Sequence, residues 1–380
     1  MSLPWPGRDS QYAVFHQRVR DRFWPHDLLL TTVDMRPNGG LGRVTSKNVV
    51  LCRDSFAHLA TAVRHGNGRD WWVVVPTLNS DQFVLYLLDP SGLHGPYLRQ
   101  SPLRWSGGYY AFWGHQCAFS PQGTRFARMS GENGLHIYDF DRCTGEFSCP
   151  RKAAVPGQER GATGVAFSPN GRFVYVSTSQ TLLQYDLSEN DLGKSGKLIG
   201  EFDGFEAPLP TTFYQMMLAP DQKIYMSCTN GAWVLHTIHA PDRKGTACDF
   251  RQHDLLLPAQ NGFVLPNFPH FRVYDWADSP CDTLGVDVPP GLGEPVSKND
   301  TLLLWPNPAQ DHAYIAVPDT CCFPNTLRVY SATGALVKEE AWLTPGETYD
   351  LDVRLLAEAV YFLVFANEKI TKTVKLVVAR

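Results

Sequence analysis

The chain lacks several features that would place it in a known functional class. No apolar run reaches the roughly 18 residues that a membrane-spanning helix needs. None of its nine cysteines forms a C-x-x-C pair or a Cys/His cluster with zinc-site spacing. The motifs G-x-S-x-G, H-E-x-x-H and the phosphate-binding loop are missing as well. The sequence therefore predicts no transmembrane segment, no metal, no cofactor and no catalytic residue.

A signal peptide is also missing from the first residues. MSLPWPGRDSQYAVFH has neither a basic stretch nor the apolar core that follows it in such peptides. A strong basic balance is equally absent, since the formal net charge is -4, and we expect no nucleic-acid partner.

What the chain does contain favours an all-β protein. Hydrophobic residues make up 43% of its 380 residues and charged residues only 19%, with 31 glycines and 28 prolines. This composition is typical of a folded, turn-rich chain rather than a disordered or coiled-coil one. The cysteines leave two alternatives open. In a secreted protein, a Cys143–Cys149 bridge could close the loop CTGEFSC, or most cysteines could be small buried apolar residues.

A unit of about fifty residues repeats along the first two thirds of the chain. CAFSPQGTRFARMS recurs as VAFSPNGRFVYVS, with weaker copies in MMLAPDQKIYMS and TAVRHGNGRDWWVVV. If Ala62, Ala118, Ala166 and Met217 are equivalent, the spacings are 56, 48 and 51 residues. Each copy consists of an apolar strand, a tight turn and a second, alternating strand.

A third strand in each unit ends near an aspartate. The four aspartates are spaced by 55, 50 and 47 residues, in step with the first series: Asp34, Asp89, Asp139 and Asp186. Equivalent placement in successive units predicts a structural role, in which the carboxylate accepts backbone N–H groups at a turn. The alternative is a metal site that draws one aspartate from each unit.

Units of this length with three or four strands are typical of β-propeller blades. The F-S-P-[NQ]-G turn resembles the hairpin of WD40-like and YVTN-like bacterial surface propellers, although the blades lack the Trp-Asp dipeptide. About four and a half blades of an expected seven fit into residues 1–273. The first unit, which starts at YAVFH, is expected to lack its innermost strand, and LPNFPHFRV to carry the last one. We therefore expect further blades upstream of Met1.

Residues 274–300 are rich in Pro, Gly and Asp and are predicted to be a linker. The following residues, 301–380, contain Pro306-Asn307-Pro308, then RVYSATGALV with Gly334, then VYFL with Tyr361, and a last strand that carries Lys372 and Lys375. In this order the elements resemble the type A C-terminal sorting domain of the bacterial type IX secretion system.

The resemblance implies a small immunoglobulin-like sandwich of about seven strands. It further implies export to the outer surface of a Gram-negative bacterium or into the medium, with the secretion machinery as partner. Lys372, Lys375 and Arg380 could contact that machinery, or could simply be lysines and arginine that solvate an edge strand. Because such a tail acts only after passage into the periplasm, we expect an export signal upstream of Met1.

Candidate ligand-binding residues are few. His65 and Asp70 lie in RHGNGRDWW, a segment that suggests a carbohydrate or acid–base site but also fits an ordinary hairpin turning at Asn67-Gly68. In the hairpin interpretation, Trp71 and Trp72 pack between blades. His115 precedes an innermost strand near the channel end where propellers often bind ligands.

Three hypotheses about function follow. The leading one is a non-enzymatic surface propeller that binds an extracellular protein or glycan. The alternative is a secreted lyase or glycosidase with catalytic residues in upstream blades. A third is a spacer or adhesion scaffold within a larger surface protein.

Overall fold

The computed structural model describes residues 1–20, 24–56, 60–78, 80–101, 103–105, 116–157, 161–267, 269–277, 279–284, 303–316, 326–341, 348–366 and 371–379. The chain divides into two compact units, residues 1–292 and residues 293–380. Each unit is described by itself below. No helix in the described part of the chain is long and apolar enough to cross a membrane.

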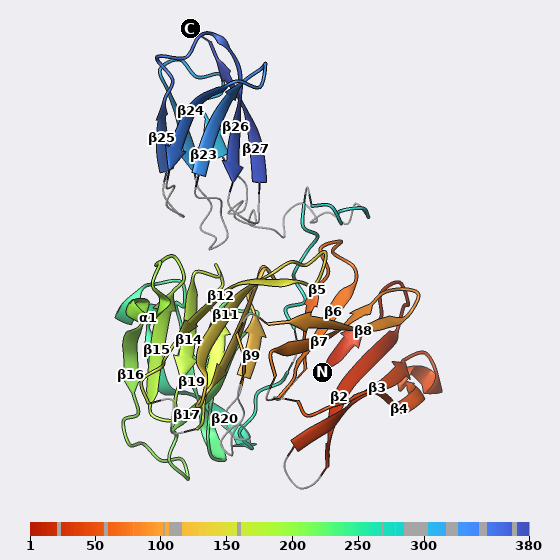
Figure 1. Ribbon diagram of the computed structural model, residues 1–380. Coiled ribbons are helices and arrows are strands. Elements are labelled where there is room, and N and C mark those ends of the chain that lie inside the picture. The colour runs from red at the N-terminus through yellow and green to blue at the C-terminus, as the bar shows by residue number, and fades with distance from the viewer. Residues whose placement is uncertain are drawn as a thin grey trace. The chain divides into compact units, whose positions relative to one another are not determined.

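The first unit contains five four-stranded antiparallel sheets that follow one another along the chain (Figure 1). Their strands are β1 (Ser2–Pro4), β2 (Gln11–Arg20), β3 (Trp24–Asp34) and β4 (Arg43–Arg53); β5 (Thr61–Arg64), β6 (Trp71–Pro76), β7 (Gln82–Leu88) and β8 (Leu93–Gln100); β9 (Gln116–Phe119), β10 (Arg125–Ser130), β11 (Gly134–Phe140) and β12 (Phe147–Ala153); β13 (Gly164–Phe167), β14 (Phe173–Ser177), β15 (Thr181–Asp186) and β16 (Lys197–Glu201); β17 (Phe213–Leu218), β18 (Ile224–Cys228), β19 (Ala232–Ile238) and β20 (Phe250–Asn261). Short helical turns lie between some of them: η1 (Asn38–Gly40), α1 (Leu192–Ser195) and η4 (Gly245–Cys248).

Apolar side chains from neighbouring sheets share each hydrophobic cluster. Trp71 packs with residues of the first sheet, whereas the next residue, Trp72, packs with residues of the third. Successive side chains of a strand point to opposite faces, so one strand supplies both interfaces. Two further clusters join the third sheet to the fourth and the fourth to the fifth. Sheets that pack face to face in series in this way form a β-propeller, as the repeats predicted.

The F-S-P-x-G turn is closed by its serine. In the fourth sheet, the Ser168 hydroxyl accepts the backbone N–H of Phe173 at 3.0 Å, and the Gly171 N–H donates to the Ser168 carbonyl at 2.9 Å. Gly171 has φ of +72°, which a glycine adopts without steric cost. The third sheet repeats the bond, from the Arg125 N–H to the Ser120 hydroxyl at 3.1 Å. The same local chemistry therefore sets the same hairpin in both units.

Two predictions about the strands of the first and last blades are wrong. The first sheet does have an innermost strand, because β1 pairs with β2 in the register Leu3↔Ala13. A three-residue strand that includes a proline is too short for its alternation to be seen in the sequence. The fifth sheet already ends with β20, so LPNFPHFRV does not carry the last strand of the propeller.

Instead, the residues after β20 return across the propeller. We call residues 262–284 the strap; residues 268 and 278 within it lie outside the described part. The Asn267 side-chain amide donates to the Ala60 carbonyl at 2.9 Å, and the Phe271 ring contacts the Trp71 ring edge-on at 5.6 Å. Of the predicted linker at 274–300, residues 274–284 thus belong to the first unit, while residues 285–300 lie outside the described residues.

In the second unit, the described residues form seven strands in two sheets. One sheet has the order β21 (Leu303–Trp305), β22 (His312–Ala316), β25 (Thr348–Asp352); the other has the order β24 (Leu336–Ala341), β23 (Thr326–Ser331), β26 (Ala359–Ala366), β27 (Thr371–Val378). Ile315 and Leu351 from the first sheet share one buried core with Val329, Leu363 and Leu376 from the second. This unit is therefore a small two-sheet sandwich.

The Pro306-Asn307-Pro308 segment fastens the start of this unit to its last strand. The Asn307 side chain donates to the Lys375 carbonyl at 2.8 Å and accepts the Val377 N–H at 2.8 Å, as a backbone amide of a neighbouring strand would. The two prolines offer no N–H for such pairing, so the asparagine side chain supplies it. Gly334 turns the hairpin between β23 and β24 with φ of +83°, and Tyr361 is buried in the core.

Replacing Asn307 with alanine should loosen this end of the sandwich. Two hydrogen bonds are lost, each worth about 1 kcal/mol net, so we expect about 1 to 2 kcal/mol of destabilisation. Hydrogen exchange of the Val377 amide in the full chain measures this directly. As a matched control, Asn38→Ala removes an exposed asparagine bond in the other unit and should leave that amide unchanged. Unaltered protection in Asn307→Ala would contradict the assigned role.

Candidate functional site

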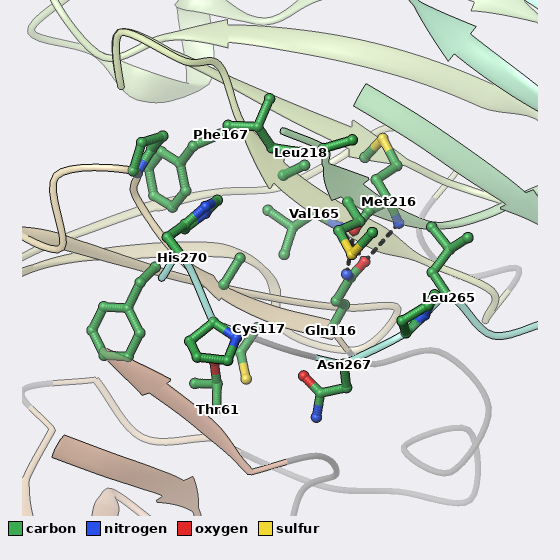
Figure 2. Close-up of a pocket in the computed structure, with 18 of the residues that line it drawn as sticks. Thr61, Gln116, Cys117, Val165, Phe167, Met216, Leu218, Leu265, Asn267 and His270 are labelled. Carbon is green, nitrogen blue, oxygen red and sulfur yellow. Dashed lines mark hydrogen bonds between the residues drawn. The ribbon is translucent and has the colours of Figure 1, made fainter. Parts of the chain in front are cut away.

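The first unit encloses a cavity of about 430 Å³. Its walls come from the innermost strands of four sheets, β5, β9, β13 and β17, and from strap residues Leu265 to Asn267 and Pro269 to Arg272 (Figure 2). Innermost strands of a propeller surround its axis, so the cavity lies in the central channel. The strap supplies the remaining wall.

Gln116 at the start of β9 ties three of these strands together. Its side-chain oxygen accepts the backbone N–H of Val165 and of Met216, each at 3.0 Å, and its amide donates to the Met216 carbonyl at 2.6 Å (Figure 2). All of its polar atoms are thus engaged in the frame. The pairing of β17 with β18 is irregular between Phe213 and Met216, and this is where the chain meets Gln116.

That irregular segment also explains Gly164. A Cβ on Gly164 would lie 3.0 Å from the Gln215 Cα and closer still to the Tyr214 carbonyl oxygen. Only glycine lets the start of β13 approach the β17 backbone so closely.

Three other polar side chains around the cavity keep hydrogen-bonding groups that no described residue uses. Thr61 and Gln215 are more than nine-tenths buried and line the cavity, and their side chains make no hydrogen bond within the described part of the chain. The Asn267 amide nitrogen is used, but its oxygen has no donor among the described residues. Figure 2 shows Thr61, Asn267 and His270 around the space. The cavity therefore offers a hydroxyl, an amide and an amide oxygen for hydrogen bonds to a ligand.

The cavity carries little charge. Burial raises the pKa of the Cys117 thiol to about 12, against the opposing effect of the neighbouring Arg128, so the thiol stays protonated. Burial lowers the pKa of His270 below its usual value, although a bond to the Phe119 backbone works the other way, so its ring is neutral at pH 7. Among the described lining residues there is no carboxylate, and Arg272 is the one cation.

A disulfide and an arginine hold the strap in place. Cys143, in the turn between β11 and β12, is bonded to Cys281 of the strap across a Cα–Cα distance of 5.6 Å. The predicted Cys143–Cys149 bridge is therefore wrong. The Arg142 guanidinium donates to the Tyr274 and His65 carbonyls. Bonding partners 138 residues apart cannot be found from cysteine spacing.

The strap lies directly on the β5–β6 hairpin. The Trp276 N–H donates to the Gly66 carbonyl at 2.6 Å, and a Cβ on Gly66 would lie 2.9 Å from the Cys143 sulfur and closer still to that of Cys281. Gly68 is crowded in the same way, since its Cβ would lie 2.7 Å from the Asp275 nitrogen. The glycines of RHGNGRD thus make room for the strap and its disulfide.

Gly66→Ala should disturb the disulfide. The added methyl overlaps both sulfur atoms, and overpacking of this kind costs about 1 to 3 kcal/mol. We expect a lower melting temperature, and reduction of the Cys143–Cys281 bond at a lower dithiothreitol concentration than in the parent protein. Gly92→Ala is the matched control: Gly92 lies in a turn of the same sheet, and its Cβ would meet nothing within 4 Å. Equal stability of the two variants would refute the predicted clash.

The structure places His65 and Asp70 in this hairpin and not on the cavity. His65 accepts the Asn67 N–H at Nδ1, so its Nε2 carries the proton that it donates to the Cys143 carbonyl at 3.1 Å. The Asp70 carboxylate accepts from the Asn67 amide at 2.7 Å and from the Arg69 guanidinium at 2.7 Å. Both side chains are thus committed to the turn.

The four repeated aspartates belong to four different sheets. Asp34 accepts the Arg36 N–H at 3.0 Å, Asp89 those of Ser91 and Gly92 at 2.7 and 2.9 Å, and Asp186 that of Ser188 at 3.2 Å; Asp139 faces the Arg125 guanidinium at 3.8 Å. Among described residues no cluster of three or more potential metal ligands occurs. His115 lies outside the described residues, and its neighbour Gln116 reaches the channel.

Comparison with known proteins identifies the second unit. Residues 303–379 match the family model of the secretion system C-terminal sorting domain. No curated protein matches the chain.

Several solved structures are similar in fold. One is PorZ, a surface component of the type IX secretion system of Porphyromonas gingivalis, at 12% identity over 99% of this chain and 59% of that one, with a TM-score of 0.37. Another is the periplasmic gluconolactonase PpgL of Pseudomonas aeruginosa, at 14% identity over 68% and 71%, with a TM-score of 0.42. The chain thus spans less than two thirds of PorZ. At these identities and TM-scores the likeness says nothing about ligand or activity.

Proposed function

We propose that this β-propeller, which carries a type IX secretion sorting domain at residues 303–379, is a non-enzymatic binding module whose ligand occupies the central cavity. The observation that supports binding is the set of uncommitted, buried polar groups on the cavity wall, Thr61 and Gln215. Polar groups in this position can pair with a ligand without breaking a hydrogen bond of the frame.

The cavity favours binding over catalysis because its titratable groups are in unreactive states. A protonated Cys117 thiol is a poor nucleophile, and a neutral His270 has no described carboxylate on the cavity wall to orient it. We propose that the sorting domain delivers this module to the cell surface or the medium, where its ligand is extracellular.

A cavity-filling variant tests the proposal. Met217 lines the cavity, and Met217→Trp should abolish retention of ligands on an array of extracellular glycans and proteins. Leu98→Trp adds the same side chain at an exposed position of β8, away from the cavity, and should bind like the parent. Recovery of the bound ligand unchanged supports a binding module, whereas turnover of the ligand would show an enzyme.

A further inference from the structure

We infer that the ligand of the central cavity is a neutral, hydroxyl-rich ring, such as the terminal sugar unit of an extracellular glycan. The inference rests on the proposed function, since it names the class of ligand for the same site. It is based on three properties of the cavity wall: its charge, the kind of hydrogen-bonding side chains that it presents, and the hydrogen bonds that its backbone already makes.

The charge of the wall disfavours an ionic ligand. A cationic ligand would enter a cavity whose described lining has no carboxylate, and whose histidine is neutral at pH 7. For an anionic ligand, the one cation among the described lining residues is Arg272, which is exposed to solvent and so screened. Moving an unpaired charge from water into this apolar space would cost more free energy than contacts with the cavity wall could offset. A neutral ligand incurs no such cost.

The free polar groups suit hydroxyls. The Thr61 hydroxyl and the Gln215 amide each donate and accept, and the Asn267 oxygen accepts. A ligand hydroxyl also donates and accepts, so it can pair with any of these groups. The exposed ring of Phe271 and the apolar side chains of β13 and β17 offer the flat surface that the C–H face of a sugar packs against.

Part of the wall backbone, on β13 and β17, is not available to a peptide. An extended peptide binds a sheet by pairing with free N–H and C=O groups of a strand. Here the N–H groups of Val165 and Met216 and the Met216 carbonyl are already taken by Gln116. A cavity of about 430 Å³ lies within the range of small-molecule sites, which fits a ring compound.

The test uses the full chain and a defined set of probes. These are the methyl glycosides of glucose, galactose, mannose and N-acetylglucosamine, the corresponding uronic acids, and a blocked tripeptide. Saturation-transfer NMR identifies binders, and calorimetry measures their dissociation constants. Gln215→Met and Thr61→Val remove the free polar groups while keeping side-chain volume. We expect each to weaken binding of a neutral glycoside by roughly three- to tenfold.

Gln82→Met is the matched control, because Gln82 is exposed at the start of β7 and does not line the cavity. It should leave the dissociation constant unchanged. Binding that depends on Gln215 but is confined to uronic acids overturns the neutral ligand. Binding confined to the tripeptide overturns the sugar class. Both outcomes leave the proposed binding function in place. Binding of glycosides that neither substitution weakens overturns the assignment to this cavity. Hydrolysis of a bound glycoside overturns the proposed function itself.

Discussion

Replacing Cys281 with serine is expected to lower the free energy of unfolding of the propeller by about 3 to 5 kcal/mol. The Cys143–Cys281 bond closes a loop with a sequence separation of 138 residues, so it removes much of the freedom of the unfolded chain. It also fixes the strap, which supplies one wall of the cavity. We therefore expect the variant to lose ligand binding together with stability.

Urea unfolding of the full chain, followed by tryptophan fluorescence, measures the effect. Cys143→Ser and the double variant should be as unstable as Cys281→Ser, because all three lose the same bond. Cys52→Ser replaces a partly buried cysteine that is in no disulfide and should change little. Unchanged stability of Cys281→Ser would contradict the Cys143–Cys281 pairing.

The fold could be predicted largely because it depends on local sequence patterns that repeat. Each hairpin depends on residues a few positions apart, such as Ser168, Phe173 and Gly171, and the alternation of each strand follows from which side chains it buries. The innermost strand β1 was missed because three residues cannot show alternation. The sorting domain was recognised from spaced turn and strand elements, and residues 303–379 match that family.

The strap and the cavity could not be predicted for a different physical reason. The strap has no regular strand in its described residues, and bonds to residues far away in sequence hold it. Gln116 and Gln215 stand in strands as unremarkable polar residues. Only the packing of three sheets shows that backbone groups saturate Gln116, whereas the Gln215 side chain makes no hydrogen bond to a described residue. The residue types of His65 and Asp70 suggest a carbohydrate or acid–base site, whereas in the structure both side chains form hydrogen bonds within a turn.

Acidification from pH 7 to about 4.5 should destabilise the propeller through two buried histidines. Burial, aided by the nearby charge of Arg128, lowers the pKa of His136 to about 4, and burial lowers that of His236 to about 4. His236 accepts the His253 N–H at Nδ1 and faces the Thr211 carbonyl at Nε2, so a proton on Nδ1 would break the first bond. Both rings must therefore stay neutral in the folded state.

The sign follows from proton uptake. The unfolded chain protonates these histidines near pH 6.5, whereas the folded protein resists until about pH 4, so the unfolded state binds more protons between these values. The free energy of unfolding should fall as the pH falls through this window, by about 3 kcal/mol per histidine at its lower end. Aspartates with a lowered pKa, such as Asp186, add to this loss only near the lower end of the window, because the unfolded chain protonates them near pH 3.9.

Urea unfolding at several pH values between 7 and 4.5 measures this slope. His136→Gln and His236→Gln keep a neutral polar side chain and should each make the pH dependence shallower, even where they lower stability at pH 7. His312→Gln changes a partly exposed histidine of the other unit and should leave the propeller transition as it is. A wild-type free energy of unfolding that does not change across this range would contradict the prediction. It would mean that the two histidines are protonated in the folded protein without losing their contacts.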